Sequence, residues 1–194
     1  MAGGGAWSSN GAILFGAGKT IRGVNALTGA SIAVELADDS ADRGLPHFLP
    51  DGNHFVYFTW SAGKGAIRAG SLGSRETQSI VQADSGAVYS NAGYLLFLRG
   101  AVLMAQPFDT RALQISGDAQ PVAADAAPGN LSSYAVFSTA GRDVLAYIRT
   151  RSGNDGQLKW FDRSGRELSA IVPPPGFDYL NPSLSPDQTR VAVR

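Results

Sequence analysis

The chain of 194 residues contains no cysteine, only two histidines, and no excess of either charge, with 16 acidic and 16 basic residues. The absence of cysteine excludes disulfides, thiolate metal sites and a thiol nucleophile, and it leaves the redox compartment open. A formal net charge of zero argues against a dedicated nucleic-acid-binding protein, which would normally carry a basic excess. No run approaches the roughly 18–20 apolar residues of a membrane helix, and the given chain shows no targeting segment at its start.

Glycine, by contrast, is abundant. The chain has 24 glycines and 10 prolines, and 44% of its residues are apolar. Glycine and proline together stay below the roughly 25–30% that marks low-complexity disorder. The apolar content is sufficient for a buried core, so the composition indicates a folded chain in which glycine has a positional role.

A short pattern recurs five times along the chain. Each copy has a large apolar residue, a polar turn of four residues and then an apolar run, and the leading residues are Trp7, Phe48, Tyr89, Phe137 and Leu184. Consecutive leading residues are separated by 41, 41, 48 and 47 positions. A repeat of this length has to be interpreted before any single motif, because it decides the fold.

The turn chemistry of the repeat predicts β-hairpins. Pro50 fixes φ where a type I turn needs it, Asp51 or Asn10 can bond the neighbouring backbone, and a glycine ends each of the first four turns. We expect short loops closed by a glycine bulge. Gln188 replaces the glycine in the last copy, at a cost of about 1 kcal/mol if the left-handed geometry is kept, which predicts a looser turn.

Three further strand-like runs follow the turn in each of the first four copies, so that one period of about 40–50 residues holds four antiparallel strands. This is the blade of a β-propeller. The sequence predicts an all-β fold, a single incomplete propeller over residues 1–194 with about four and a half blades and no linker. The predicted blades span residues 6–40, 45–83, 86–124 and 133–173, with a partial blade at 179–194. We interpret residues 114–118, 123–130 and 173–176 as loop insertions.

Three segments, at residues 48–52, 160–165 and 181–187, resemble the TolB-like, WD40-like propeller repeats of bacteria. Residues 93–98 and 103–109 more narrowly resemble the propeller found C-terminal to bacterial transmembrane serine/threonine protein kinases. The resemblance implies an extracytoplasmic or periplasmic sensing domain. The motifs of the kinase itself do not occur in this chain.

From these features we expect a non-catalytic module that binds a protein, a peptide or a small molecule at a propeller face or in the central channel, without nucleic acid. Two alternatives stay open: a propeller that gates an attached serine peptidase, as in prolyl-oligopeptidase-like proteins, or a TolB-like envelope assembly module. We assign no catalytic, cofactor-binding or metal-binding residue.

Two motifs resemble catalytic signatures. Residues 16–20 look like the end of a phosphate-binding loop, but Ile13 occupies the position of the required first glycine, so we interpret them as a hairpin loop. Residues 84–86 (Asp-Ser-Gly) match half of an aspartic-protease site, and without a second copy they are interpreted as a turn between blades.

The remaining polar clusters also have structural interpretations. His47 and His54 flank the turn that contains Asp51, but a metal site needs a third ligand and turn geometry already explains Asp51. Residues 38–42 gather three carboxylates without the spacing of a calcium loop. Asn130 begins a glycosylation sequon that matters only in a eukaryotic secretory context. The three tryptophans at positions 7, 60 and 160 belong to blade packing or to an aromatic patch.

Open terminal blades predict self-association of the isolated chain, because exposed strand edges pair with other chains. We expect aggregation or oligomers in size-exclusion chromatography with light scattering. A monodisperse monomer that melts in one sharp cooperative transition would contradict this expectation.

Overall fold

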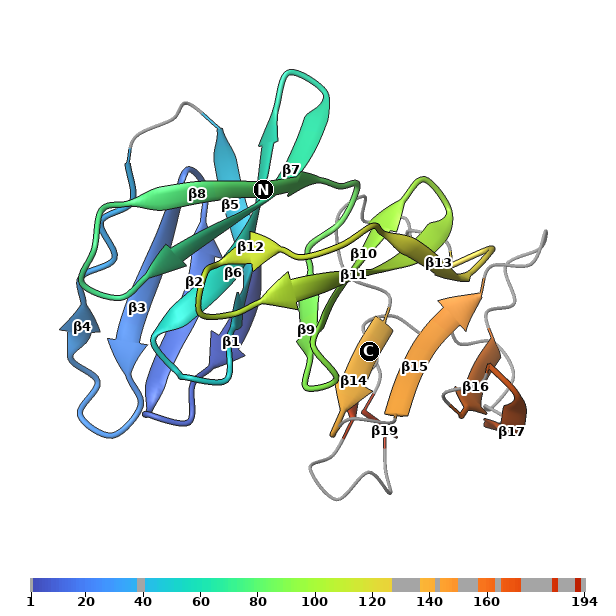
Figure 1. Ribbon diagram of the computed structural model, residues 1–194. Helices are drawn as coiled ribbons and strands as arrows, with labels where there is room; N and C mark the ends of the chain where they lie inside the picture. The colour runs from blue at the N-terminus through green and yellow to red at the C-terminus, as the bar shows by residue number, and fades with distance from the viewer. Residues whose placement is uncertain are drawn as a thin grey trace.

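The computed structural model describes residues 2–37, 41–126, 137–141, 144–149, 157–162, 165–171, 183–184 and 191–192. The regular structure of these residues consists of β-strands, and four antiparallel sheets follow one another as the blades of a propeller (Figure 1). The predicted all-β propeller with four-stranded antiparallel blades is therefore confirmed. Within the same residues, no helix has the length and apolar character needed to cross a membrane.

The first two blades are simple meanders, in which each strand pairs with the next one along the chain. The first blade consists of β1 (Ala2–Trp7), β2 (Ala12–Ala17), β3 (Thr20–Asn25) and β4 (Ser31–Ile32). The second consists of β5 (Asp42–Phe48), β6 (His54–Ser61), β7 (Lys64–Ser71) and β8 (Thr77–Gln82). Strand β1 begins before residue 6, where the sequence pattern first becomes visible, because the glycine-rich start of the chain pairs with β2.

The third blade has a divided outer edge. It contains β9 (Val88–Ser90), β10 (Tyr94–Arg99) and β11 (Val102–Asp109), and its outer positions are β12 (Gln114–Ile115) and β13 (Gln120–Ala123). Both outer strands pair with β11, one near each end. The insertion expected as a loop at residues 114–118 thus contributes a strand. Asp109 accounts for it, because its side chain accepts hydrogen bonds from the backbone N–H groups of Arg111 and Ala112 and turns the chain back.

The fourth blade contains β14 (Phe137–Ala140), β15 (Val144–Arg149), β16 (Gln157–Phe161) and β17 (Glu167–Ile171). A two-stranded sheet of β18 (Ser183–Leu184) and β19 (Val191–Ala192) follows. The described residues do not include 127–136, 173–176 or the turn with Gln188, so the predictions for these positions, including the sequon at Asn130, lie outside them.

The hairpin between the first and second strands of a blade has the predicted geometry. In the first blade, the Gly11 N–H donates to the Ser8 carbonyl at 3.0 Å and the Ser8 N–H donates to the Ala12 carbonyl at 2.8 Å. Gly11 has a φ of +82°, in the left-handed region that a bulge glycine adopts. Gly52 and Gly93 close the same turn in the next two blades, with φ of +69° and +94°.

The hydrophobic cores lie between blades rather than within them. On β6, Phe55 and Tyr57 pack in one cluster with Leu14 of the first blade. The intervening Val56 packs in a different cluster with Phe97 of the third blade. Because successive side chains of a strand point to opposite faces, a strand buried on both faces needs an uninterrupted apolar run. This explains the apolar run that follows each turn.

Strand β10 repeats the arrangement one blade further on. Leu95 and Phe97 face the second blade. Leu96 and Leu98 contribute to the cluster that contains Tyr147 of the fourth blade. The second strand of a blade therefore joins both of its neighbours to one sheet.

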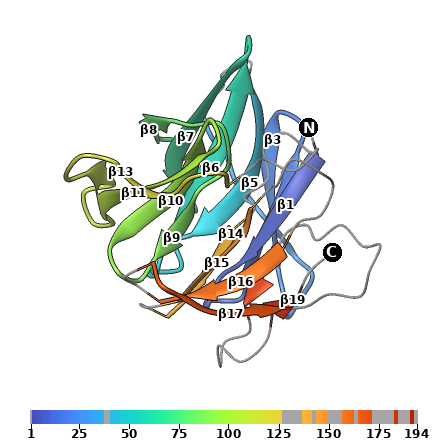
Figure 2. The same cartoon turned by 90° about the vertical axis from the view of Figure 1, so that its right-hand side faces the viewer.

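The first strands of the blades meet around the propeller axis, where β1 contacts β5, β5 contacts β9, and β9 contacts β14 (Figure 2). Leu45 of β5 lies at this junction between Gly4 and Gly86. A Cβ atom at Gly4 would approach Leu45 Cδ2 to 2.8 Å, and one at Gly86 would approach Leu45 Cβ to 2.9 Å. The missing side chains thus permit the close approach of three blades.

The Asp-Ser-Gly triplet at residues 84–86 is an inter-blade turn, as predicted, and it also supports β10. The Asp84 N–H donates to the Leu98 carbonyl, and the Leu98 N–H donates to Ser85 Oγ, both at 2.9 Å. Asp84 Oδ2 accepts a hydrogen bond of 2.6 Å from the Gly100 N–H. Ser85 is fully buried, so its hydroxyl satisfies the Leu98 N–H, which lies beyond the end of the short strand β9.

We predict that Ser85→Ala destabilises the protein by about 1–3 kcal/mol, because the buried Leu98 N–H loses its acceptor. Urea unfolding measures the change. Ser116→Ala, at an exposed position whose hydroxyl makes no hydrogen bond within the described residues, is the matched control. Equal unfolding midpoints for the two variants would show that Ser85 has no such role.

Candidate functional site

The turns between the first and second strands of the blades lie at one end of the propeller, which we call the turn face. It comprises residues 8–11, 49–52 and 90–93 and the described turn residue Gly141 of the fourth blade. The sequence-based prediction of a turn over residues 138–141 is wrong for this blade, because Ser138, Thr139 and Ala140 pair with β15 and extend β14. The turns of the first two blades are tied together, since Ser8 Oγ donates to the Gly52 carbonyl at 2.9 Å and Asn10 Nδ2 donates to the Asp51 carbonyl at 3.4 Å. The turn face is therefore a continuous surface across blade boundaries.

A pocket of about 310 Å³ opens at the centre of the turn face, and we call it the axial pocket. All four blades contribute to it. Its walls include Trp7, Ser9, His47, Tyr89, Asn91 and Thr139. None of the described residues that line it is acidic or basic apart from His47.

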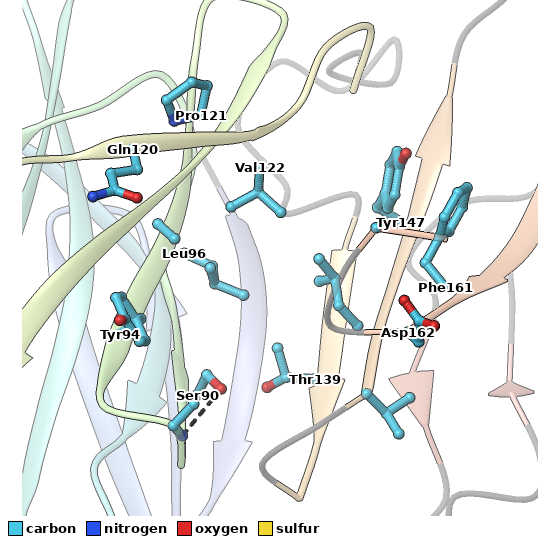
Figure 3. Close-up of a pocket in the computed structure, with 15 residues that line it drawn as sticks. Ser90, Tyr94, Leu96, Gln120, Pro121, Val122, Thr139, Tyr147, Phe161 and Asp162 are labelled. Carbon is cyan, nitrogen blue, oxygen red and sulfur yellow. Dashed lines mark hydrogen bonds between the residues drawn. The ribbon is translucent and has the colours of Figure 1, made fainter. Parts of the chain in front are cut away.

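A second pocket of about 660 Å³, the inter-blade pocket, lies between the third and fourth blades (Figure 3). One wall carries Tyr94, Leu96 and Val122, and the opposite wall carries Tyr147 and Phe161. These two rings stack with their centroids 5.3 Å apart. Tyr94 and Val122 are 40% and 47% exposed, so apolar surface remains in contact with solvent here.

The two pockets adjoin each other. Thr139 of β14 lines both of them, and Ser90 and Asn91 of the third turn belong to one pocket each. Together they form a recess that runs from the axis to the gap between two blades. The residues that line this recess span much of the chain, from Trp7 to Gly165.

His47 is neutral at pH 7. Burial lowers the pKa of its imidazole to about 4, and a hydrogen bond with the Tyr89 backbone opposes this change. The bond raises the pKa, so the ring donates a proton to the Tyr89 carbonyl, and its other nitrogen is left as an acceptor. His47 thus contributes a neutral polar group to the axial pocket.

His54 and Asp51 act within their own turn. The Asp51 carboxylate accepts hydrogen bonds from the backbone N–H groups of Asn53 and His54, and it contacts His54 Nδ1. Desolvation acts to raise the pKa of Asp51, but the bonds from the His54 side chain and from the two N–H groups lower it below its usual value. Asp51 is a turn residue, as its sequence position indicates.

The other motifs considered in the sequence do not form one common site in the described residues. Residues 16–20 form the hairpin between β2 and β3, with Gly18 at a φ of +65°, as predicted. The described residues contain no group of three histidine, aspartate or glutamate side chains that could hold a metal ion, and residues 38–40 of the acidic cluster lie outside them. Trp7 lines the axial pocket, whereas Trp60 packs beside Phe58 with ring centroids 6.3 Å apart.

Sequence reasoning did not single out Thr139, Asn91 or the backbone of Tyr89 as site residues. Each was visible only as part of a repeat turn or its leading residue. Asn91 and Thr139 each lie two positions after the leading residue of their copy. This shared position could have placed them together, because equivalent segments of successive blades lie at one end of a propeller.

We predict that the free energy of unfolding falls as the pH is lowered from about 6.5 to about 4. In this range the unfolded chain binds a proton at His47 and the folded chain does not, so acid favours unfolding. The change in the pKa of His47 from 6.5 to about 4 limits its contribution to the free energy of unfolding to about 3 kcal/mol. Because the ring keeps partial contact with solvent, we expect a contribution of about 1–2 kcal/mol.

Urea unfolding at several pH values checks this dependence. His47→Gln should flatten the profile in that range, because the amide keeps a donor for the Tyr89 carbonyl without titrating. His54→Gln, which keeps the His47 imidazole, is the control for replacing a histidine. Parallel profiles for the wild type and His47→Gln would refute the assignment.

No protein-family model and no curated protein matches the chain. Among solved structures, TolB from Acinetobacter baumannii matches with a TM-score of 0.71 and 20% identity, over 98% of this chain and 48% of TolB. The calcium-binding protein regucalcin from Agrobacterium tumefaciens matches with a TM-score of 0.67 and 17% identity, over 100% of this chain and 67% of regucalcin. The chain thus spans about half the length of TolB, and the likeness shows a shared propeller fold.

Proposed function

We propose that this chain is a non-catalytic binding module whose ligand occupies the turn face. The observation that carries the proposal is the recess formed by the axial and inter-blade pockets, which share Thr139 and are lined by all four blades. A site built from several blades is rigid, because the three cores between neighbouring blades hold the second and third blades on both faces and the first and fourth blades on one. Rigid support with exposed turns suits recognition.

The polar groups at the recess favour binding over catalysis. His47 donates to a backbone carbonyl, and the Asp51 carboxylate is engaged by the backbone of its own turn. Ser8 Oγ donates to the Gly52 carbonyl and accepts from the Asn10 N–H. Ser8, His47 and Asp51 are therefore used in holding the turns and do not form a nucleophile–base pair with one another, so we propose that the chain itself is not an enzyme.

We further propose that the module is the extracytoplasmic sensory part of a larger receptor-like serine/threonine kinase. The support is the resemblance of residues 93–98 and 103–109 to kinase-linked propellers, and these residues form the central strands β10 and β11. The ligand would bind outside the membrane at the turn face, and the kinase would lie elsewhere in the protein.

Experiments on the full-length protein test both the binding site on the turn face and the kinase context. Thr139→Trp places a bulky ring in the wall shared by the two pockets and should change ligand-dependent autophosphorylation by about tenfold or more, as expected for blocking a central contact. The matched control is Lys64→Trp, at the exposed start of β7 on the hairpin at the opposite end of the propeller. Phosphate incorporation measures the effect, and the melting temperature confirms that both variants fold.

Equal autophosphorylation by the two tryptophan variants would overturn the turn face as the binding site. A reading frame that contains a Gly-x-Ser-x-Gly serine peptidase, and no kinase motifs or membrane helix, would overturn the kinase context. Such a frame would favour a propeller that gates a peptidase.

A further inference from the structure

The residues of the axial pocket also indicate the chemical class of its ligand. This inference rests on the proposed binding role. We propose that it binds an uncharged pyranose sugar, with the ring of the sugar against Trp7 and its hydroxyl groups on Ser9, Asn91 and Thr139.

The size of the pocket sets the size of the ligand. Its volume of about 310 Å³ lies at the lower end of the range of about 300–1,000 Å³ for small-molecule sites. One compact molecule fits, and an extended chain does not. The pocket is open at the turn face, so that a sugar at the end of a longer glycan can also enter.

Among the described residues, the lining of the pocket offers no counter-charge to an ionic ligand. The described residues around it contain no aspartate, glutamate, lysine or arginine, and His47 is neutral at pH 7. Asp51, the nearest carboxylate in sequence to the lining residue Pro50, is held by the N–H groups of Asn53 and His54. A charged ligand would lose its hydration here without a counter-charge, which is costly in a partly enclosed site.

The polar side chains are available for a ligand with many hydroxyl groups. Ser9, Asn91 and Thr139 make no side-chain hydrogen bond within the described part of the chain. Asn91 offers both a donor and an acceptor, the two hydroxyls offer the same, and His47 keeps one acceptor nitrogen. Neutral groups that both donate and accept match hydroxyl groups, which also do both.

The backbone N–H groups that close three of the turns beside the pocket are already engaged. Gly11, Gly52 and Gly93 donate their N–H groups to the carbonyls of Ser8, Leu49 and Ser90, which closes three of the turns. A peptide that binds by strand addition needs free backbone groups at an edge. Recognition in this pocket therefore relies on side chains, and this favours a sugar over a peptide.

Trp7 supplies the flat apolar surface. It lies at the end of β1, and its side chain is 71% exposed although tryptophan is usually well buried. Phe48 and Tyr89 line the same pocket. A pyranose has an apolar face of C–H groups and a rim of hydroxyls, so it can stack on an indole while its rim bonds the neutral polar groups.

The test titrates the chain with methyl α-D-glucopyranoside, methyl β-D-galactopyranoside and N-acetylglucosamine, with glucuronate and glucosamine as charged counterparts. The indole N–H signals of Trp7 and Trp60 in ¹⁵N-correlated NMR spectra serve as internal probes. We expect at least one neutral sugar to shift the Trp7 signal saturably, with a Kd of about 1–10 mM. The Trp60 signal should not move, because Trp60 lies near the hairpin at the opposite end of the second blade.

Two variants locate the site. Trp7→Ala and Asn91→Ala alter exposed side chains and should each weaken sugar binding by about tenfold, as expected for the loss of one stacking or hydrogen-bonding contact. Trp60→Phe is the control and should bind like the wild type. For Trp7→Ala, saturation-transfer NMR on the sugar protons replaces the missing indole signal.

Three results would overturn the proposal: no saturable shift up to about 50 mM of every neutral sugar, tighter binding of glucuronate or glucosamine, or unchanged affinity in Trp7→Ala. If Thr139→Trp still changes autophosphorylation in the full-length protein, the binding role of the turn face survives while the sugar class fails. Failure of both experiments removes the binding role as well.

Discussion

The burial of β6 and β10, the second strands of the two middle blades, on both faces is the constraint on which this structure depends. Val56 and its neighbours Phe55 and Tyr57 divide between two cores, and the alternation of side chains along a strand leaves no other arrangement. Each core cluster of the described residues joins two neighbouring blades, so each blade is held by the next one. The turn that precedes each of these strands is therefore held rigidly as well.

The same constraint places the candidate site. Blades that pack face to face bring their first strands together at the axis, and Leu45 fills the junction because Gly4 and Gly86 have no side chains. Equivalent turns then converge at one end. Trp7 and Thr139, which are far apart in the sequence, become walls of one pocket. The packing of successive blades, rather than any local motif, creates the recess.

The electrostatic character of the turn face also follows from turn chemistry. Asp51 is used to close its own turn, and His47 is kept neutral by burial. The chain carries 32 charged residues in total, yet the described lining of the axial pocket is uncharged at pH 7. The residues of the first three turns are mostly small and neutral, and the Asp51 carboxylate is engaged within its own turn. This is the character that the proposed sugar site requires.

The amino-acid sequence by itself determined the blades, because the residues that specify each turn and strand are close together in the chain. A proline, an aspartate or asparagine and a glycine make the turn, and an apolar run makes a strand buried on both faces. The interpretations of residues 16–20 and 84–86 as turns also held for this reason. Only the tertiary structure decided that Ser85 supports β10, that residues 114–115 pair with β11, and that Trp7, Asn91 and Thr139 share a pocket. These features depend on the distances between blades, which no short stretch of sequence encodes.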